Sequence, residues 1–221
     1  MNVILIAPPA AGKGTQAEML REEYNLYHLS TGDVLREIAN SNTEIGKEVK
    51  EIIDSGNLIS DDLMLEILKE KINSLENNNG IIFDGFPRTI NQAEMLSNLL
   101  SSMNQQIDYV IYLDIEKEEA MKRSTGRITC SKCKKIYNIY FDSFNEQNKC
   151  NECGNMLEKR EDDTEEKFNH RFETYIKNTR PVIDYYNAKG YLKVVKSTGS
   201  KYEIYERVKS IIEKGNNLWL T

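Results

Sequence analysis

Short apolar runs alternate with longer amphipathic segments along this chain. Runs rich in β-branched, leucine and aromatic residues occupy positions 3–6, 81–83, 109–113 and 191–195, and residues 27–30 are a fifth candidate strand. Continuous apolar runs of this length are typical of parallel strands that are buried on both faces. Because helical segments separate the runs, the pattern predicts an α/β fold with a five-stranded parallel sheet flanked by helices.

Two segments show the clearest helical periodicity. Apolar residues recur at helical intervals in residues 61–75 and again in residues 163–187. In the second segment, Asp163 and Glu166 have the spacing of a capping box, which predicts that a helix starts there. Pro181 lies inside the same segment and should kink or break the helix, because proline lacks a backbone donor.

Two other segments interrupt the alternation. Residues 30–60 look like a helical insertion, and residues 126–163 are rich in Cys, Lys, Asn and Tyr without a helical period. We therefore expect two insertions in a core formed by residues 1–29, 61–125 and 164–221. At 221 residues and 39% hydrophobic composition, the chain is long enough for one such core but not for several independent domains.

Composition and charge narrow the setting. No stretch approaches the roughly eighteen consecutive apolar residues of a membrane span, and the N-terminus lacks a signal-peptide pattern. A cytoplasmic protein without a membrane partner is therefore expected. The formal net charge of -6 argues against a general nucleic-acid binder.

A loop between the first strand and a helix carries a phosphate-binding pattern. Residues 7–15 (APPAAGKGT) lie where backbone N–H groups and a helix N-terminus can hold a phosphate, and Lys13 would bridge the β- and γ-phosphates. The pattern is partial, because Ala7 stands where a glycine usually opens it and Gly14 separates Lys13 from Thr15. A strand-to-helix turn with a surface lysine is the alternative interpretation.

Two further polar motifs follow predicted strands. Residues 30–36 (STGDVLR) offer a hydroxyl group at a loop and an arginine one turn into a helix, although alone they could be a helix cap with a solvated arginine. Residues 84–88 (DGFPR) follow the third strand, and Gln92 comes one turn later. An arginine suits phosphate because its planar fork pairs two oxygens. Asp84 stands where an acidic residue can order Mg²⁺ through water.

Four cysteines form two closely spaced pairs. Cys130 and Cys133 precede Cys150 and Cys153, with sixteen residues between the pairs. Two such turns can bring four thiolates around one tetrahedral Zn²⁺, which would be structural because four protein ligands leave no open position. Flanking lysines could instead make this segment a nucleic-acid-binding zinc module, although nearby acidic residues dilute the positive charge.

Together these motifs resemble those of adenylate kinases, in the long form with a zinc-binding lid. The GKGT run, the DGFPR run and a four-cysteine segment between Arg127 and Arg160 occur in the family's order. The resemblance implies a P-loop kinase core, an AMP-binding helical insertion at residues 30–60 and a small β-rich lid at residues 126–163. It also implies a monomeric enzyme that moves a phosphoryl group directly, in line, from MgATP to AMP, giving two ADP while the lid closes.

The resemblance also implies which residues form the site. Contacts to ATP would come from Ala10, Ala11, Gly12, Lys13, Gly14, Thr15, Arg123, Arg127, Ile136, Tyr137 and Gly199. Contacts to AMP would come from Thr31, Arg36, Asn57, Leu58, Ile59, Gly85, Phe86, Pro87, Arg88, Gln92, Arg160 and Arg171. The catalytic charges would be those of Lys13, Arg36, Arg88, Arg123, Arg127, Arg160 and Arg171, with Asp84 ordering Mg²⁺.

The phosphate loop departs from the family pattern at two positions, where Ala7 and Ala10 replace the usual glycines. If position 10 needs a left-handed backbone, an alanine there costs about 1–2 kcal/mol. A nucleotide-binding protein with impaired turnover is therefore one alternative function. A kinase for another nucleoside monophosphate is a second, although Thr31 and Gln92 favour AMP.

Overall fold

The computed structural model describes the chain except for residues 76–78, 143–147, 161–162 and 217–221. Five strands form one parallel sheet in the order β2-β3-β1-β4-β8. They are β1 (Val3–Ile6), β2 (Tyr27–Ser30), β3 (Ile81–Asp84), β4 (Tyr109–Asp114) and β8 (Leu192–Lys196). The predicted α/β fold is confirmed, and each strand boundary lies within one residue of its predicted position.

Helices cover both faces of the sheet because the strands present apolar side chains to each face in turn. Val3 of β1 belongs to one buried apolar cluster and Ile4 belongs to the other. The first cluster draws on α1 (Lys13–Tyr24), α6 (Lys117–Thr125) and α9 (Lys201–Asn216), and the second on α4 (Asp61–Asn73), α5 (Ile90–Ser102) and α8 (Arg180–Ala188). Each fully buried aliphatic side chain contributes about 1.5–3 kcal/mol, so this packing fixes where the strand ends lie.

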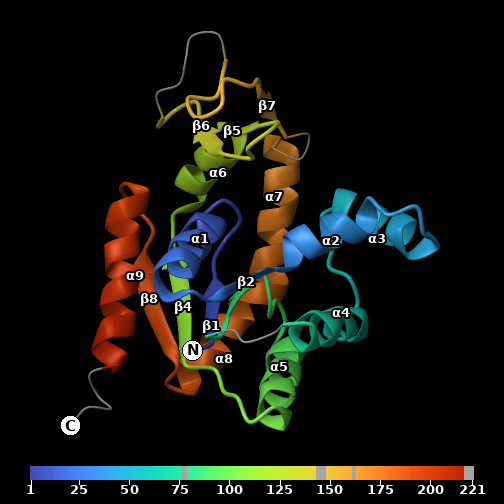
Figure 1. Cartoon of the computed structure of the whole chain (residues 1–221), viewed down its shortest axis with the longest axis vertical. Coiled ribbons are helices and arrows are strands. Elements are labelled where there is room, and N and C mark those ends of the chain that lie inside the picture. The colour runs from blue at the N-terminus through green and yellow to red at the C-terminus, as the bar shows by residue number, and fades with distance from the viewer. Residues whose placement is uncertain (76–78, 143–147, 161–162, 217–221) are drawn as a thin grey trace.

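Two helices project from the sheet as an arm (Figure 1). They are α2 (Thr31–Ala39) and α3 (Glu44–Asp54). The hydroxyl of Ser30, the last residue of β2, accepts a hydrogen bond from the backbone N–H of Asp33 and so caps α2. Because the helix begins where the strand ends, the first residues of α2 lie at the carboxyl edge of the sheet.

A second, smaller sheet lies beyond the carboxyl ends of the parallel strands (Figure 1). In it, β5 (Arg127–Cys130) pairs antiparallel with β6 (Ile136–Asn138) and β7 (Leu157–Lys159). We call residues 126–163, which contain this sheet, the lid. Among the described residues of the lid, the buried apolar cluster comprises Cys130, Tyr137, Cys150 and Leu157. So small a cluster supplies little stability of its own.

The long helical segment after the lid differs from prediction at its start, and at its proline it widens instead of breaking. Helix α7 (Glu165–Thr174) is capped by Thr164, whose hydroxyl accepts from the backbone N–H of Lys167, so the predicted capping box of Asp163 and Glu166 is wrong. Pro181 does not break the segment. A π-helical turn, η1 (Tyr175–Thr179), precedes α8, and this wider turn accommodates the missing proline donor.

Candidate active site

The phosphate loop lies between β1 and α1, and part of it has a left-handed backbone. Ala10 has a φ of 61° and Gly12 a φ of 89°. Glycine adopts this region freely, whereas an L-residue with a Cβ does so at a cost. Position 10 therefore does need the conformation that makes alanine costly there. Lys13 follows as the first residue of α1.

Lys13 lies at the centre of a cluster of charges. Desolvation lowers the pKa of its ammonium group, the carboxylate of Asp84 raises it, and the charges of Arg88, Arg127 and Arg171 lower it further. Each of these four groups is therefore close enough to act on the Lys13 charge. The predicted site residues from the phosphate loop, β3, β5 and α7 come together here, and their excess positive charge suits a polyanionic ligand.

Asp84 ends β3 beside the phosphate loop. Its Oδ2 lies 3.2 Å from Nε2 of His28, which donates because a carboxylate only accepts. Burial raises the pKa of the Asp84 carboxyl group, but the hydrogen bond from His28 and the charge of Lys13 outweigh burial and hold the pKa below its ordinary value. The group is therefore a carboxylate, the ligand type that hydrated Mg²⁺ prefers.

His28 was not singled out from the sequence. It lies on β2, whose residue pairs with β3 place it opposite Ile82, two residues before Asp84. The alternation of a strand predicts that residues two apart share a face. The pairing of β2 with β3 was the missing information, since it brings the imidazole and the carboxylate together.

The turn after β3 is packed against the start of α2. The hydroxyl of Thr31 donates to the backbone oxygen of Asp84 at 3.2 Å, and Nε of Arg88 donates to the backbone oxygen of Gly85 at 2.8 Å. Gly85 has a φ of 85°, and a Cβ there would lie 2.5 Å from the Thr31 hydroxyl. This position therefore requires glycine. Phe86 and Pro87 are buried beneath the turn.

Arg36 lies on the arm, where it forms an ion pair with Asp33 of its own helix. Burial lowers the pKa of Arg88 and the charge of Asp84 raises it. The charges of Arg171 and Arg36 lower it further, so Arg36 nevertheless acts on Arg88. After the arm ends, Asn57 and Leu58 line an open cleft of about 710 Å³ whose other wall includes residues 173–174 and 177–178. Ile59 is buried, at 6% exposed.

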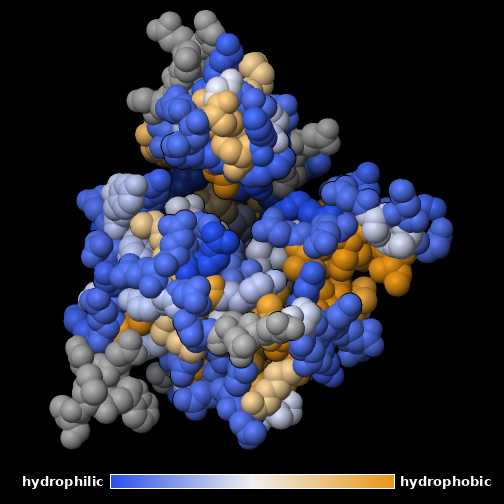
Figure 2. Space-filling view, in the orientation of Figure 1, coloured by the Kyte–Doolittle hydropathy of each residue, from blue (hydrophilic) through white to orange (hydrophobic). Residues whose placement is uncertain are grey.

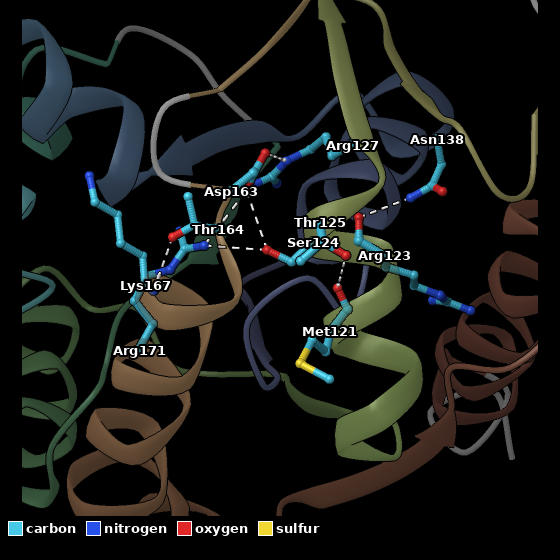
Figure 3. A network of polar contacts seen from close by, with 10 residues as sticks. All are labelled: Met121, Arg123, Ser124, Thr125, Arg127, Asn138, Asp163, Thr164, Lys167 and Arg171. Carbon is cyan, nitrogen blue, oxygen red and sulfur yellow. Dashed lines mark hydrogen bonds and ion pairs between the residues drawn. The ribbon is translucent and has the colours of Figure 1, made fainter.

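We call the junction of the core and the lid, around Arg127 and Asp163, the hinge (Figure 3). It contains a fully buried carboxylate. Asp163 accepts a hydrogen bond from Nε of Arg127 at 2.7 Å and one from the hydroxyl of Ser124 at 3.3 Å. Nη2 of Arg171 lies 3.7 Å from its Oδ1. One side chain therefore joins the end of α6, the start of β5 and α7. Sequence reasoning assigned Asp163 to a helix cap and missed this role.

Arg123 lies beside the phosphate loop rather than on the lid. It forms an ion pair with Glu119 at 2.6 Å and donates to the hydroxyl of Ser197 at 3.4 Å. Ser197 is buried, and its hydroxyl donates to the backbone oxygen of Ala11 at 2.7 Å. The end of β8 is thereby tied to the loop. Gly199, two residues later, has a φ of 97°.

The four cysteine sulfurs lie close together in the lid, all within 4.8 Å of one another. Cys130 and Cys153 are 3.4 Å apart at Sγ, and Cys133 and Cys150 are 3.5 Å apart. The S–S bond of a disulfide is ~2.05 Å long, so these separations are too long for one. They are close to the ~3.8 Å between sulfurs that surround Zn²⁺ at ~2.3 Å. The donor set therefore fits a tetrahedral zinc ion.

The remaining lid residues are placed differently from one another. Ile136 is half exposed, whereas Tyr137 is buried and its hydroxyl lies 3.3 Å from Sγ of Cys150. This hydrogen bond, together with those from the backbone N–H groups of Cys153 and Glu152, lowers the pKa of the Cys150 thiol to about 6. Of the pair, Ile136 alone presents its side chain outward. Arg160 follows β7, and its backbone oxygen accepts from the N–H of Asp163 at 3.1 Å.

The surface is hollowed where these elements meet, beneath the lid and beside the arm (Figure 2). The family model described as "Adenylate kinase" matches residues 5–191. This chain belongs to the adenylate kinase family. An adenylate kinase from Archaeoglobus fulgidus is 42% identical over 214 residues, covering 97% of this chain and 99% of the relative. One from Thermodesulfovibrio yellowstonii is 43% identical over 214 residues, covering 97% and 100%.

The family membership agrees with the α/β core. An adenylate kinase from Oceanobacillus iheyensis is also similar, at 41% identity over 214 residues, with 97% of this chain and 100% of the relative covered. Within the described ranges, none of the helices combines the length and the apolar composition that crossing a bilayer requires.

Proposed function

We propose that this chain catalyses reversible transfer of the γ-phosphoryl group from MgATP to AMP, giving two ADP. The observation that carries the proposal is the set of charges around Lys13 at the carboxyl edge of the sheet, where Arg88, Arg127 and Arg171 all act on its pKa. Ligands of open α/β sheets bind at this edge. A transferring phosphoryl group needs such a cluster because negative charge spreads over its oxygens.

On the donor side, the backbone of the phosphate loop and Lys13 hold the ATP phosphates, with Arg123 and Arg127 approaching from the hinge. The other donor contacts are assigned to Ala10, Ala11, Gly12, Gly14, Thr15, Ile136, Tyr137 and Gly199. When bound with ATP, Mg²⁺ would neutralise charge on the phosphates, and Asp84 would hold it through water.

On the acceptor side, Thr31 and Gln92 meet the adenine of AMP, while Arg36 and Arg88 hold its phosphate. Backbone groups at residues 57–59 and 85–87 line this pocket, and Arg160 and Arg171 reach the phosphates of both substrates. The AMP phosphate then attacks the γ-phosphorus in line with the departing ADP. Positioning and neutralisation carry the reaction, so no protein nucleophile is required.

The lid, which we assign to residues 126–163, closes over the substrates and excludes water, so that ATP is not hydrolysed. Zn²⁺ on the four cysteines would hold the lid together, and the acceptor domain would be residues 30–60. We further assign the protein to the cytoplasm, as a monomer without a nucleic-acid or membrane partner. The excess of acidic residues, which gives a net charge of -6, supports the exclusion of nucleic acid.

A coupled assay of ADP formation from ATP and each of AMP, GMP, UMP and CMP tests the proposal. We expect AMP to be the preferred acceptor and turnover to require Mg²⁺. Higher activity with another monophosphate would show that this nucleotide, and not AMP, is the acceptor. Tight nucleotide binding without turnover would instead favour a nucleotide-binding protein that has lost activity through Ala7 and Ala10.

A further inference from the structure

Gln92 lies at the start of α5, and both polar atoms of its amide have a protein partner. Its Oε1 accepts from the backbone N–H of Arg88 at 2.7 Å, and its Nε2 donates to Oδ1 of Asp61 at 2.7 Å. Gln92 is only 3% exposed. The amide is therefore held in a small buried site that has one donor on one side and one carboxylate on the other.

These two partners permit a single orientation of the amide. A backbone N–H can only donate and a carboxylate can only accept, so Oε1 must face Arg88 and Nε2 must face Asp61. Rotating the amide by half a turn would place its oxygen against the carboxylate and its NH₂ group against the N–H. Both hydrogen bonds would then be lost in a buried setting.

Asp61 is itself held firmly against the start of α5. It is the first residue of α4, and its carboxylate also accepts from Nδ2 of Asn91 at 2.8 Å and from the hydroxyl of Thr89 at 3.3 Å. Asp62, its neighbour in the same first turn, is exposed. Three donors from one segment therefore fix the Asp61 carboxylate beside Gln92.

We propose that Asp61 sets the base specificity of the acceptor site by fixing the amide orientation of Gln92. The inference rests on the proposed function, in which Gln92 meets the adenine of AMP. With its two protein partners bound, Nε2 keeps one N–H and Oε1 keeps one lone pair. These remaining positions recognise the base.

The two classes of purine present opposite patterns to such an amide. Adenine offers an acceptor at N1 and a donor at its 6-amino group, whereas hypoxanthine and guanine offer a donor at N1 and an acceptor at O6. A fixed amide matches one pattern only, and an amide that can rotate matches either. Asp61 is thus a positioning residue that excludes 6-oxopurines without touching the substrate.

The substitution Asp61→Asn tests this role, because asparagine offers both an oxygen and an NH₂ group, so that only the backbone N–H of Arg88 still opposes rotation of the Gln92 amide. The measurement is kcat/KM for AMP and for IMP, which differ in the purine only at positions 1 and 6. We expect the AMP-to-IMP ratio to fall by about tenfold, with IMP activity rising in absolute terms. Asp61→Glu keeps an acceptor-only carboxylate and should keep a ratio closer to that of the wild type.

The matched control is Asp62→Asn, which removes the same charge from the same turn of α4 and should leave the ratio unchanged. If Asp61 only tied α4 to α5, Asp61→Asn would lower Tm and reduce both kcat/KM values by one common factor, and the inference would be overturned. If Asp61→Asn does not fold, Asp61→Ser gives the same test, because a hydroxyl both donates and accepts. A wild-type protein that forms no ADP from ATP and AMP would refute the proposed function, whereas an unchanged ratio in an active variant would refute only the role of Asp61.

Discussion

The phosphate loop and the lid both contain residues other than glycine in the left-handed region, Ala10 in the loop and Lys134 and Asn148 in the lid. Their surroundings differ. The loop is held by neighbours from the core, with Ala7 and Ala11 buried and Ser197 bonded to the Ala11 oxygen. The lid has a small apolar cluster in its described part, and its four cysteine sulfurs converge on one point.

This difference indicates how each region tolerates change. In the loop, many core contacts impose one backbone conformation, so a residue that disfavours it adds strain without undoing the turn. In the lid, the small apolar cluster supplies little stability, so losing one of the four cysteines should unfold the whole lid. Substitutions in the loop should therefore have graded effects, and substitutions at the lid cysteines should have all-or-none effects on lid structure.

Removing the metal should have the largest effect. Structural zinc contributes about 10–16 kcal/mol to the folding of small zinc domains. Chelation, or Cys150→Ser, should therefore melt the lid while the core keeps its own thermal transition. Metal analysis with hydrogen exchange of residues 127–159 would measure this, and Lys132→Gln, at an exposed position beside Cys133, is the control. An unchanged melt after chelation would mean that the cysteines do not clamp the lid.

Lys13→Met should have the next largest effect, on activity rather than on folding. Losing one preorganised charge at the transferring group costs about 10²–10³-fold in kcat. Because desolvation already lowers the pKa of Lys13, its neutral replacement should not lower Tm. Steady-state kinetics and a thermal melt together check both statements, with Lys47→Met on the exposed face of the arm as the control. A parallel loss of Tm and activity would contradict this prediction.

Local patterns were sufficient for the strands and for the cysteine cluster, because both follow from residue spacing alone. Local patterns were insufficient where the role of a side chain depends on a partner that is distant in the sequence. Asp163 was predicted to cap helix α7, and the sequence could not show that Arg127 would draw Asp163 into the hinge and leave the cap to Thr164. The same holds for His28 and Ser197, whose partners come from other strands and loops.

Pro181 shows a different limit of prediction. Proline's missing donor correctly predicted a disturbance in the helical segment, but nothing in the sequence distinguishes a break from a wider turn. The N–H of Arg180 bonds to the oxygen of Tyr175, which is the π-helical pattern, and Tyr175 and Thr179 of η1 are buried. Packing of the segment against the core favours a continuous helix, which the π turn preserves.

Asp163→Asn tests the connection between the core and the lid and should have an intermediate effect. Removing one partner of a buried ion pair costs about 3–5 kcal/mol, but Arg127 and Arg171 are 19% and 27% exposed and can turn to solvent, so about 1–3 kcal/mol is expected. A thermal melt would show a Tm lowered by about 2–4 °C per kcal/mol. Glu165→Gln, on the exposed start of α7, is the control. A Tm equal to that of the control would show that the buried carboxylate does not hold the hinge.

The smallest effect, and the sharpest test of imposed strain, comes from the two alanines of the loop. Ala10→Gly should stabilise the protein by about 0.5–1 kcal/mol, because relief of a left-handed alanine, about 1–2 kcal/mol, exceeds the added chain entropy of glycine. Ala7→Gly should destabilise it by a similar amount, since Ala7 is buried and has no left-handed backbone to relieve. Thermal melts should therefore shift in opposite directions for two substitutions of the same chemistry. If Ala10→Gly instead lowered Tm, as Ala7→Gly should, the left-handed backbone at position 10 would carry no measurable strain, and the loop would tolerate alanine for a reason other than support from the core.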